Sequence, residues 1–83
     1  MVKVYFEIHK GQEVIQDLEG EEFKDLAEAK KEAEASLHEM LAEDIGQERP
    51  LVPRSITLRD QDGAELATVE LRAAVRMVQE TRN

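Results

Sequence analysis

Apolar and polar residues alternate from the second residue of the chain onward. In residues 2–9 the even positions are all apolar and the odd positions are mostly polar; the apolar ones are Val2, Val4, Phe6 and Ile8. Side chains of a strand point alternately to the two faces of a sheet, so this period of two predicts a strand with one buried face. Gly11 then marks a turn, and residues 14–18 are expected to return as the second strand of a hairpin.

The period changes to three or four residues between positions 25 and 47. Apolar side chains recur there along one stripe, made of Leu26, Ala29, Ala33, Leu37, Met40 or Leu41, and Ile45. This spacing predicts one long amphipathic helix. Asp25 and Glu28 have the spacing of a capping box at its start, and Gly46 is expected to close the helix in a left-handed cap.

A second pair of strands is predicted in the last part of the chain, over residues 55–60 and 65–71. Asp62 followed by Gly63 is typical of the turn of a hairpin, because glycine takes a positive φ without a steric penalty. Leu66 is out of phase with the apolar positions that follow it, which indicates a bulge or a bend in the last strand.

These elements predict an α+β domain of two layers, in which one long helix covers a mainly antiparallel sheet of four strands. The order along the chain is β-β-α-β-β, and we expect the strands to lie side by side in the order second, first, third, fourth. Residues 49–54 are expected to form an irregular connection, and residues 72–83 either add a short terminal helix or fray. All 83 residues are expected to form a single domain.

The acidic residues are concentrated in the middle of the chain. The net charge is −8, and residues 13–48 alone contain thirteen acids against three lysines, a charge of −10. Phosphate groups bind to clustered lysine and arginine, so this distribution disfavours a nucleic-acid-binding function. The chain has no cysteine, which excludes disulfides and thiolate metal sites. It has no long apolar run, so we expect neither a signal peptide nor a membrane span, and a cytoplasmic location.

Three segments of the chain carry a recognisable pattern: "YFEIHKG", "IQDLEGEEFKDLAEAKKEA" and "ITLRDQDGAEL". Together they resemble a small bacterial family catalogued as a domain of unknown function, whose members read aromatic-Phe-x-Ile-His-Asp-Gly, then Asp-x-Glu-Gly-x-Glu and Asp-Leu-x-x-Ala-Arg-x-Glu-Ala, then Asp-x-Asp-Gly. The resemblance runs from residue 4 to about residue 71, with departures at Lys10, Leu18 and Lys30. It implies the β-β-α-β-β order, but no activity or catalytic residue, since none is assigned to that family.

His9 is the residue best suited to acid–base chemistry. It ends the first predicted strand on the face opposite Phe6 and Ile8, and we expect it to make a structural hydrogen bond near the surface. The alternative is a general base that acts with Asp17 or Glu19 across the hairpin, in a small enzyme or ligand-binding protein. So short a chain would need a pocket at a subunit interface for that purpose.

Two acidic segments contain some of the residues of a cation site. The carboxylates of the first lie along a turn and are weak candidates for a divalent cation; they are Asp17, Glu19, Glu21 and Glu22. The second, residues 60–65, opens like a calcium loop, but the position that requires a bidentate glutamate is Leu71. We therefore expect neither a metal nor a cofactor.

The function class that the sequence favours is a non-enzymatic protein-interaction or regulatory module. The predicted fold leaves one face of the sheet without a helix, and the strand edges and the tail offer further contact surfaces. The candidate contact residues are Tyr5, His9, Leu71, Val75 and Val78. The acidic helix face would prefer a basic protein partner, and self-association as a homodimer is the other expected arrangement.

Overall fold

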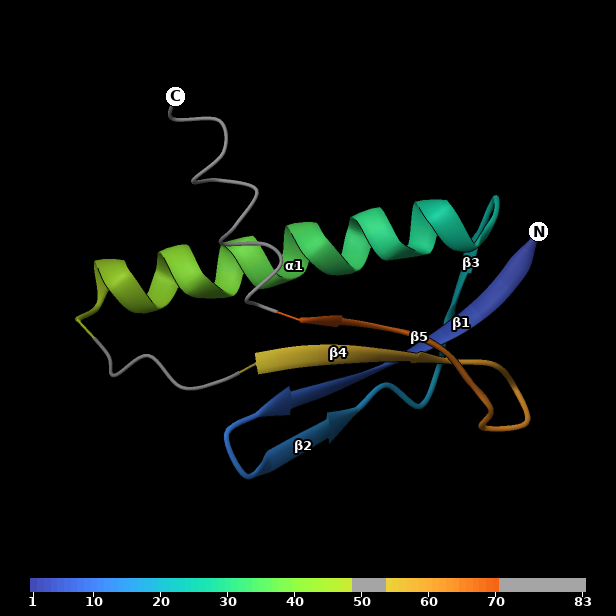
Figure 1. The fold of residues 1–83 in the computed structure, drawn as a ribbon, viewed down its shortest axis with the longest axis horizontal. Coiled ribbons are helices and arrows are strands. Elements are labelled where there is room, and N and C mark those ends of the chain that lie inside the picture. Colours follow the sequence, from blue (N-terminus) through green and yellow to red (C-terminus); the bar gives the residue numbers. More distant parts are fainter. Residues whose placement is uncertain (49–53, 71–83) are drawn as a thin grey trace.

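The computed structural model describes residues 1–48 and 54–70. Its elements, labelled in Figure 1, are β1 (Val2–Lys10), β2 (Glu13–Gln16), β3 (Glu21–Phe23), α1 (Leu26–Gly46), β4 (Arg54–Arg59) and β5 (Glu65–Glu70). The predicted terminal helix and most of the predicted connection lie outside the described residues. So do three of the candidate contact residues, Leu71, Val75 and Val78.

The described strands form one antiparallel sheet, and α1 lies across one face of it (Figure 1). The strand order is β2-β1-β4-β5, with β3 paired to β1 beside this path. The structure therefore confirms the α+β class, the two layers and the predicted order of the four main strands. No helix in the described part of the chain is long and apolar enough to cross a membrane.

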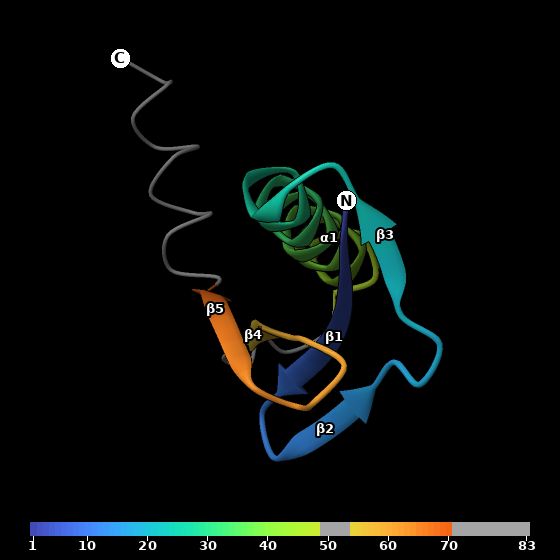
Figure 2. The same ribbon diagram turned by 90° about the vertical axis from the view of Figure 1, so that its right-hand side faces the viewer.

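Strand β3 was not predicted, and the described sheet has five strands instead of the expected four. Its three residues pair with the first half of β1, and Phe23 lies opposite Val2. β2 pairs with the second half of the same strand, and Figure 2 shows how the chain leaves the sheet between the two. The ring of Phe23 stacks on that of Phe6, with centroids 5.8 Å apart. This aromatic contact anchors a strand too short to show a period in the sequence.

Helix α1 begins as predicted and ends differently. The Oδ1 atom of Asp25 accepts a hydrogen bond of 2.9 Å from the backbone N–H of Glu28, which is the expected N-cap. Gly46 belongs to the helix itself, and the C-cap is Gln47, whose N–H donates to the carbonyl of Glu43. The left-handed residue is Glu48, with φ 55°. The prediction of a glycine cap was wrong because the helix runs past its glycine.

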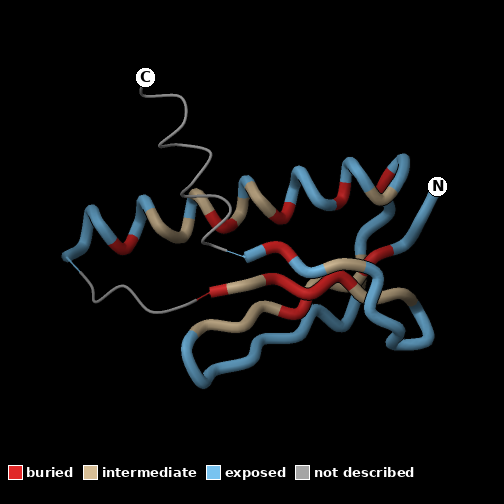
Figure 3. Tube along the Cα trace, in the orientation of Figure 1, coloured by how far each residue is buried: buried red, intermediate tan, exposed pale blue. Residues whose placement is uncertain are grey.

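The core lies between α1 and the facing side of the sheet (Figure 3). Small residues on the helix stripe let it approach closely, and branched residues of the central strands fill the space beneath it. The buried apolar residues are Val4, Phe23, Ala29, Ala33, Leu37, Ile56, Leu58 and Val69. The prediction that Ile45 belongs to the buried stripe is wrong. Ile45 is 60% exposed, and its neighbour Asp44 is buried instead, with 2% of its surface exposed. The stripe in the last turn is therefore one residue out of the predicted phase.

The β4–β5 hairpin has the turn and the bulge that the sequence predicts. The side chain of Asp60 accepts hydrogen bonds from the backbone N–H groups of Asp62 and Ala64, both 2.9 Å long, and Gly63 has φ 84°. In the strands, Leu58 pairs with Ala67 while Arg59 pairs with Glu65, so Leu66 is the extra residue of a bulge.

Candidate functional site

The face of the sheet opposite α1 carries a buried carboxylate at its centre. Glu7 of β1 lies between Gln16 of β2 and Thr57 of β4 in the strand register. It is only 9% exposed, although the alternation that directs Val4 and Phe6 toward α1 places Glu7 on the opposite face. A buried carboxylate requires hydrogen-bonding partners, and the neighbouring strands supply them.

Four contacts hold the Glu7 carboxylate, two at each oxygen. Arg59 donates from Nε to Oε2 and from Nη2 to Oε1, both at 3.2 Å. Gln16 donates from Nε2 to Oε2 at 3.1 Å, and the Nε2 atom of His9 lies 2.8 Å from Oε1. We call these four residues the Glu7 cluster. Arg59 also donates from Nη1 to the carbonyl of Gly63, which ties the cluster to the β4–β5 turn.

The charge of this cluster is fixed by its hydrogen bonds. The Arg59 guanidinium, followed by the Gln16 amide, lowers the pKa of Glu7 from 4.5 to about 2, against the opposing effect of burial. The same hydrogen bond with Glu7 raises the pKa of Arg59. At neutral pH the cluster therefore holds a carboxylate and a guanidinium in a paired, two-pronged arrangement.

His9 makes the structural hydrogen bond that the sequence predicts, but its partner is one that sequence analysis missed. The contacting carboxylate is Glu7, two residues earlier on the same face of β1, rather than Asp17 or Glu19 across the hairpin. The spacing of two could have indicated this neighbour. Arg59 gave no such signal, because it is 52 positions away and meets Glu7 only through the pairing of β4 with β1.

The four acids between β2 and α1 spread out instead of converging. Asp17 folds back on its own turn, and its Oδ1 accepts from the N–H of Glu19 at 3.0 Å. Glu21 and Glu22 are successive strand residues and point to opposite faces. Within residues 1–48 and 54–70, no three His, Asp or Glu side chains lie close enough together to hold a metal ion.

Tyr5, one of the candidate contact residues, holds the β2–β3 turn in place. Its ring packs against Gly20, where an added Cβ would lie 2.8 Å from the ring atom Cε2. The Nζ atom of Lys3 lies 5.7 Å from the ring centroid, a cation–π contact. Gly20 has φ 74°, which only glycine adopts easily. The half-buried ring of Tyr5 therefore already makes contacts within its own chain.

Exposed apolar side chains lie along the outer strand β2 and its following turn, with Val14 and Ile15 pointing to opposite faces of the sheet. Val14 and Ile15 of β2 are 53% and 51% exposed, and Leu18 in the following turn is 85% exposed. We call these three residues the edge patch. The sequence predicted the return strand but not its exposure: all four residues of β2 are exposed.

A comparison with protein-family models decides the family. The model of a domain of unknown function, DUF6894, matches residues 3–72, which is most of the chain. The chain belongs to the DUF6894 family. No curated protein and no solved structure gives a significant match to this DUF6894 domain.

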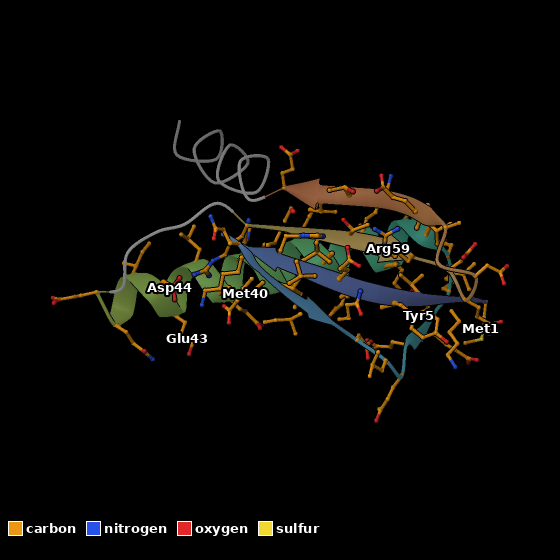
Figure 4. The ribbon with its side chains drawn as sticks, turned by 90° about the horizontal axis from the view of Figure 1, so that it is seen from below. Met1, Tyr5, Met40, Glu43, Asp44 and Arg59 are labelled. Atoms are coloured by element: carbon orange, nitrogen blue, oxygen red, sulfur yellow. The ribbon has the colours of Figure 1, made fainter. Side chains whose placement is uncertain are left out.

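The chemistry open to the Glu7 cluster of this DUF6894 domain follows from its charge state. A carboxylate with a pKa of about 2 is a weak base at neutral pH, and both of its oxygens already have two partners. The cluster thus fixes β1 to its neighbours on both sides. Figure 4, which views the molecule from below, shows Tyr5 and Arg59 far from Asp44 on α1.

Proposed function

We propose that this DUF6894 domain is a non-enzymatic protein-interaction module that binds its partner through the edge patch. The observation that carries the proposal is the exposure of Val14, Ile15 and Leu18 together on one outer strand and its turn. Single exposed apolar residues are common on protein surfaces, but neighbouring ones at a strand edge are typical of binding surfaces.

The rigidity of the β2–β3 turn supports this function. Leu18 lies between Asp17, which is hydrogen-bonded to the Glu19 N–H, and Gly20, which packs on the Tyr5 ring. A turn whose backbone is already held in place loses less conformational entropy on binding than a free one. Acidic residues surround Leu18, which is the arrangement of an apolar anchor within a polar rim.

Photo-crosslinking in the native cells tests the proposal. The photoreactive residue p-benzoylphenylalanine replaces Leu18 in one variant and Glu32, an exposed residue of α1, in the matched control. We expect a discrete crosslinked product from position 18 only, and its loss when Val14→Thr and Ile15→Thr are added. No product at position 18, or the same product from position 32, would contradict the proposed function.

The second candidate function, a small enzyme or ligand-binding protein near His9, has one observation in its favour. The strand register places Ser55 directly opposite His9, which in turn contacts Glu7. A serine, a histidine and a carboxylate are the residue types of a nucleophilic site. A fluorophosphonate probe tests this candidate: an adduct that forms on the wild type and is lost in Ser55→Ala would favour it. We expect no adduct from an interaction module.

A further inference from the structure

We propose that the partner binds as an added strand along β2, and that this strand is an extended segment rich in lysine or arginine. This inference rests on the proposed function and names the class of partner. β2 is the last strand on its side of the described sheet, because its only paired neighbour there is β1. Every second residue of such a strand directs its backbone N–H and C=O groups away from the sheet, where another strand can pair with them.

The charge around β2 selects a basic partner. Residues 13–22 contain five acids and neither lysine nor arginine. Glu13 is the first residue of β2 and Asp17 follows its last, so carboxylates bracket Val14 and Ile15 on the edge itself. Side chains of opposite charge on paired strands stabilise the pairing, and those of like charge oppose it.

A second copy of the chain fits this edge poorly for the same reason. Antiparallel pairing of β2 with its copy about Ile15 would place Glu13 opposite Asp17 of the copy, twice over. Pairing about Val14 would instead place Glu13 against Ile15 of the copy. Either register sets a carboxylate against a like charge or an apolar side chain, whereas a basic segment neutralises the same carboxylates.

The geometry also limits the length of the segment. β2 has only four residues, and the chain turns away at Asp17, whose side chain is bonded to the turn. Leu18 is the second residue after the end of the strand, where it can contact the next residue of the partner. The site therefore takes a short stretch of extended chain, with apolar contact at Leu18 and basic side chains beside the edge acids.

A synthetic peptide, acetyl-Lys-Val-Lys-Val-Lys-Val-Lys-amide, serves as the probe. We expect it to shift the NMR amide signals of β2 and Leu18 in the full chain, with an affinity that falls as salt is added. The matched peptide with glutamate in place of lysine should cause no shift. Two further peptides carry methyl groups on alternate backbone nitrogens, one on the odd residues and one on the even residues. Only one of the two should lose binding, because only one edge of the peptide pairs with β2. Shifts confined to other residues, or equal binding by both methylated peptides, would overturn strand addition.

Variants of exposed residues identify the contacts without unfolding the protein. Leu18→Ser should weaken binding of the peptide about tenfold or more, because it removes an apolar side chain that the bound peptide would cover. Ile45→Ser, at an equally apolar exposed position on α1, should leave the affinity unchanged. Replacing Glu13 by Gln and Asp17 by Asn should weaken binding by roughly two- to fivefold for each charge.

The two experiments separate the two proposals. A crosslink at position 18 without peptide binding would refute strand addition by a basic segment and leave the interaction module standing. A crosslinked product of twice the monomer mass would make a second copy the occupant and would refute the basic partner. Peptide binding at β2 together with a crosslink to a different protein is the result that both proposals predict.

Discussion

At the residue scale, Glu7 determines how the open face of the sheet is held together. Its carboxylate accepts from side chains of β2 and β4 at once, so one residue of β1 joins three strands. Arg59 makes the largest single contribution to lowering the Glu7 pKa, and its guanidinium meets both carboxylate oxygens. The cluster is thus a polar counterpart of the apolar core on the other face.

The Glu7 pKa predicts a specific dependence of stability on pH. Its value falls from 4.5 to about 2 on folding, so the ionised form stabilises the native state. This contribution is fully present above pH 4.5 and is lost as the pH falls toward 2. We expect Glu7→Gln to lower the melting temperature at neutral pH, and the difference from wild type to shrink between these two values. A difference that stays constant with pH would contradict the assignment.

Gly20 and Gly63 offer a matched pair of substitutions. Both have a positive φ, but an added Cβ would strike the Tyr5 ring at Gly20 and would meet nothing within 4 Å at Gly63. Gly63→Ala should cost about 1–2 kcal/mol, the penalty for the left-handed backbone. Gly20→Ala should cost more, since the Tyr5 ring must also move. Urea unfolding of both variants measures the difference; equal costs would mean that the Tyr5 contact contributes nothing.

Residue-scale features were predictable where they depend on near neighbours in the chain. The Asp25 cap, the Gly63 turn and the bulge at Leu66 were all predicted, because each depends on residues only a few positions apart. The Glu7 cluster was not, since a glutamate on the polar face of an alternating strand is indistinguishable from an exposed one. Its partner Arg59 is brought near only by the sheet pairing.

At the element scale, the end of α1 is fastened to the start of β4 by a buried ion pair. Asp44 Oδ2 pairs with Arg54 Nη2, and the two side chains are 3% and 2% exposed. Figure 4 shows Asp44 beside Met40 and Glu43 on α1, toward the end of the molecule away from Met1. Burial removes both charges from water, so the pair is costly to disrupt from one side only.

Removing one partner of this pair should therefore destabilise the protein strongly. Asp44→Ala leaves Arg54 buried and charged, and we expect a loss of about 3–5 kcal/mol in the free energy of unfolding. Replacing both residues together, Asp44→Leu with Arg54→Met, should be neutral or stabilising by about 1–4 kcal/mol. The exposed neighbour provides the control: Glu43→Ala should change the stability by about 0.5 kcal/mol or less. A double variant less stable than Asp44→Ala would contradict this account.

Elements were predictable in proportion to their length. The nine residues of β1 and the twenty-one of α1 carry enough repeats of their period to be recognised. β3 has only three residues, two of them acidic, and its place in the sheet depends on Phe23 stacking on Phe6. The same limit applies to the last turn of α1, where Asp44 replaces Ile45 in the buried stripe because Arg54 compensates its charge.

At the scale of the whole molecule, the charge distribution and the sheet edge work together. The chain carries a net charge of −8, and residues 13–22 along β2 contribute five acids without a base. An outer strand with exposed apolar side chains is prone to pair with other copies, and charged residues placed on it oppose this. The edge acids would thus keep the protein from associating with itself while they attract a basic partner.

Neutralising the edge acids should therefore make the protein self-associate. We expect wild type to stay monomeric by light scattering over a range of concentrations at low salt, and Glu13→Gln with Asp17→Asn to show a mass that rises with concentration. The asparagine side chain in that variant still has an oxygen to accept from the Glu19 N–H, so the turn is kept. Added salt should move wild type in the same direction, because it screens the same carboxylates.

The control for this prediction keeps the change in net charge and moves it away from the edge. Glu32→Gln with Glu39→Gln neutralises two exposed acids of α1 and should leave the protein monomeric. If both double variants associated equally, net charge alone would keep wild-type molecules monomeric, and the position of the acids at the β2 edge would not matter. If only the β2 variant associated, the added Leu18→Ser substitution should reverse it, since the leucine supplies the exposed apolar contact beside the edge.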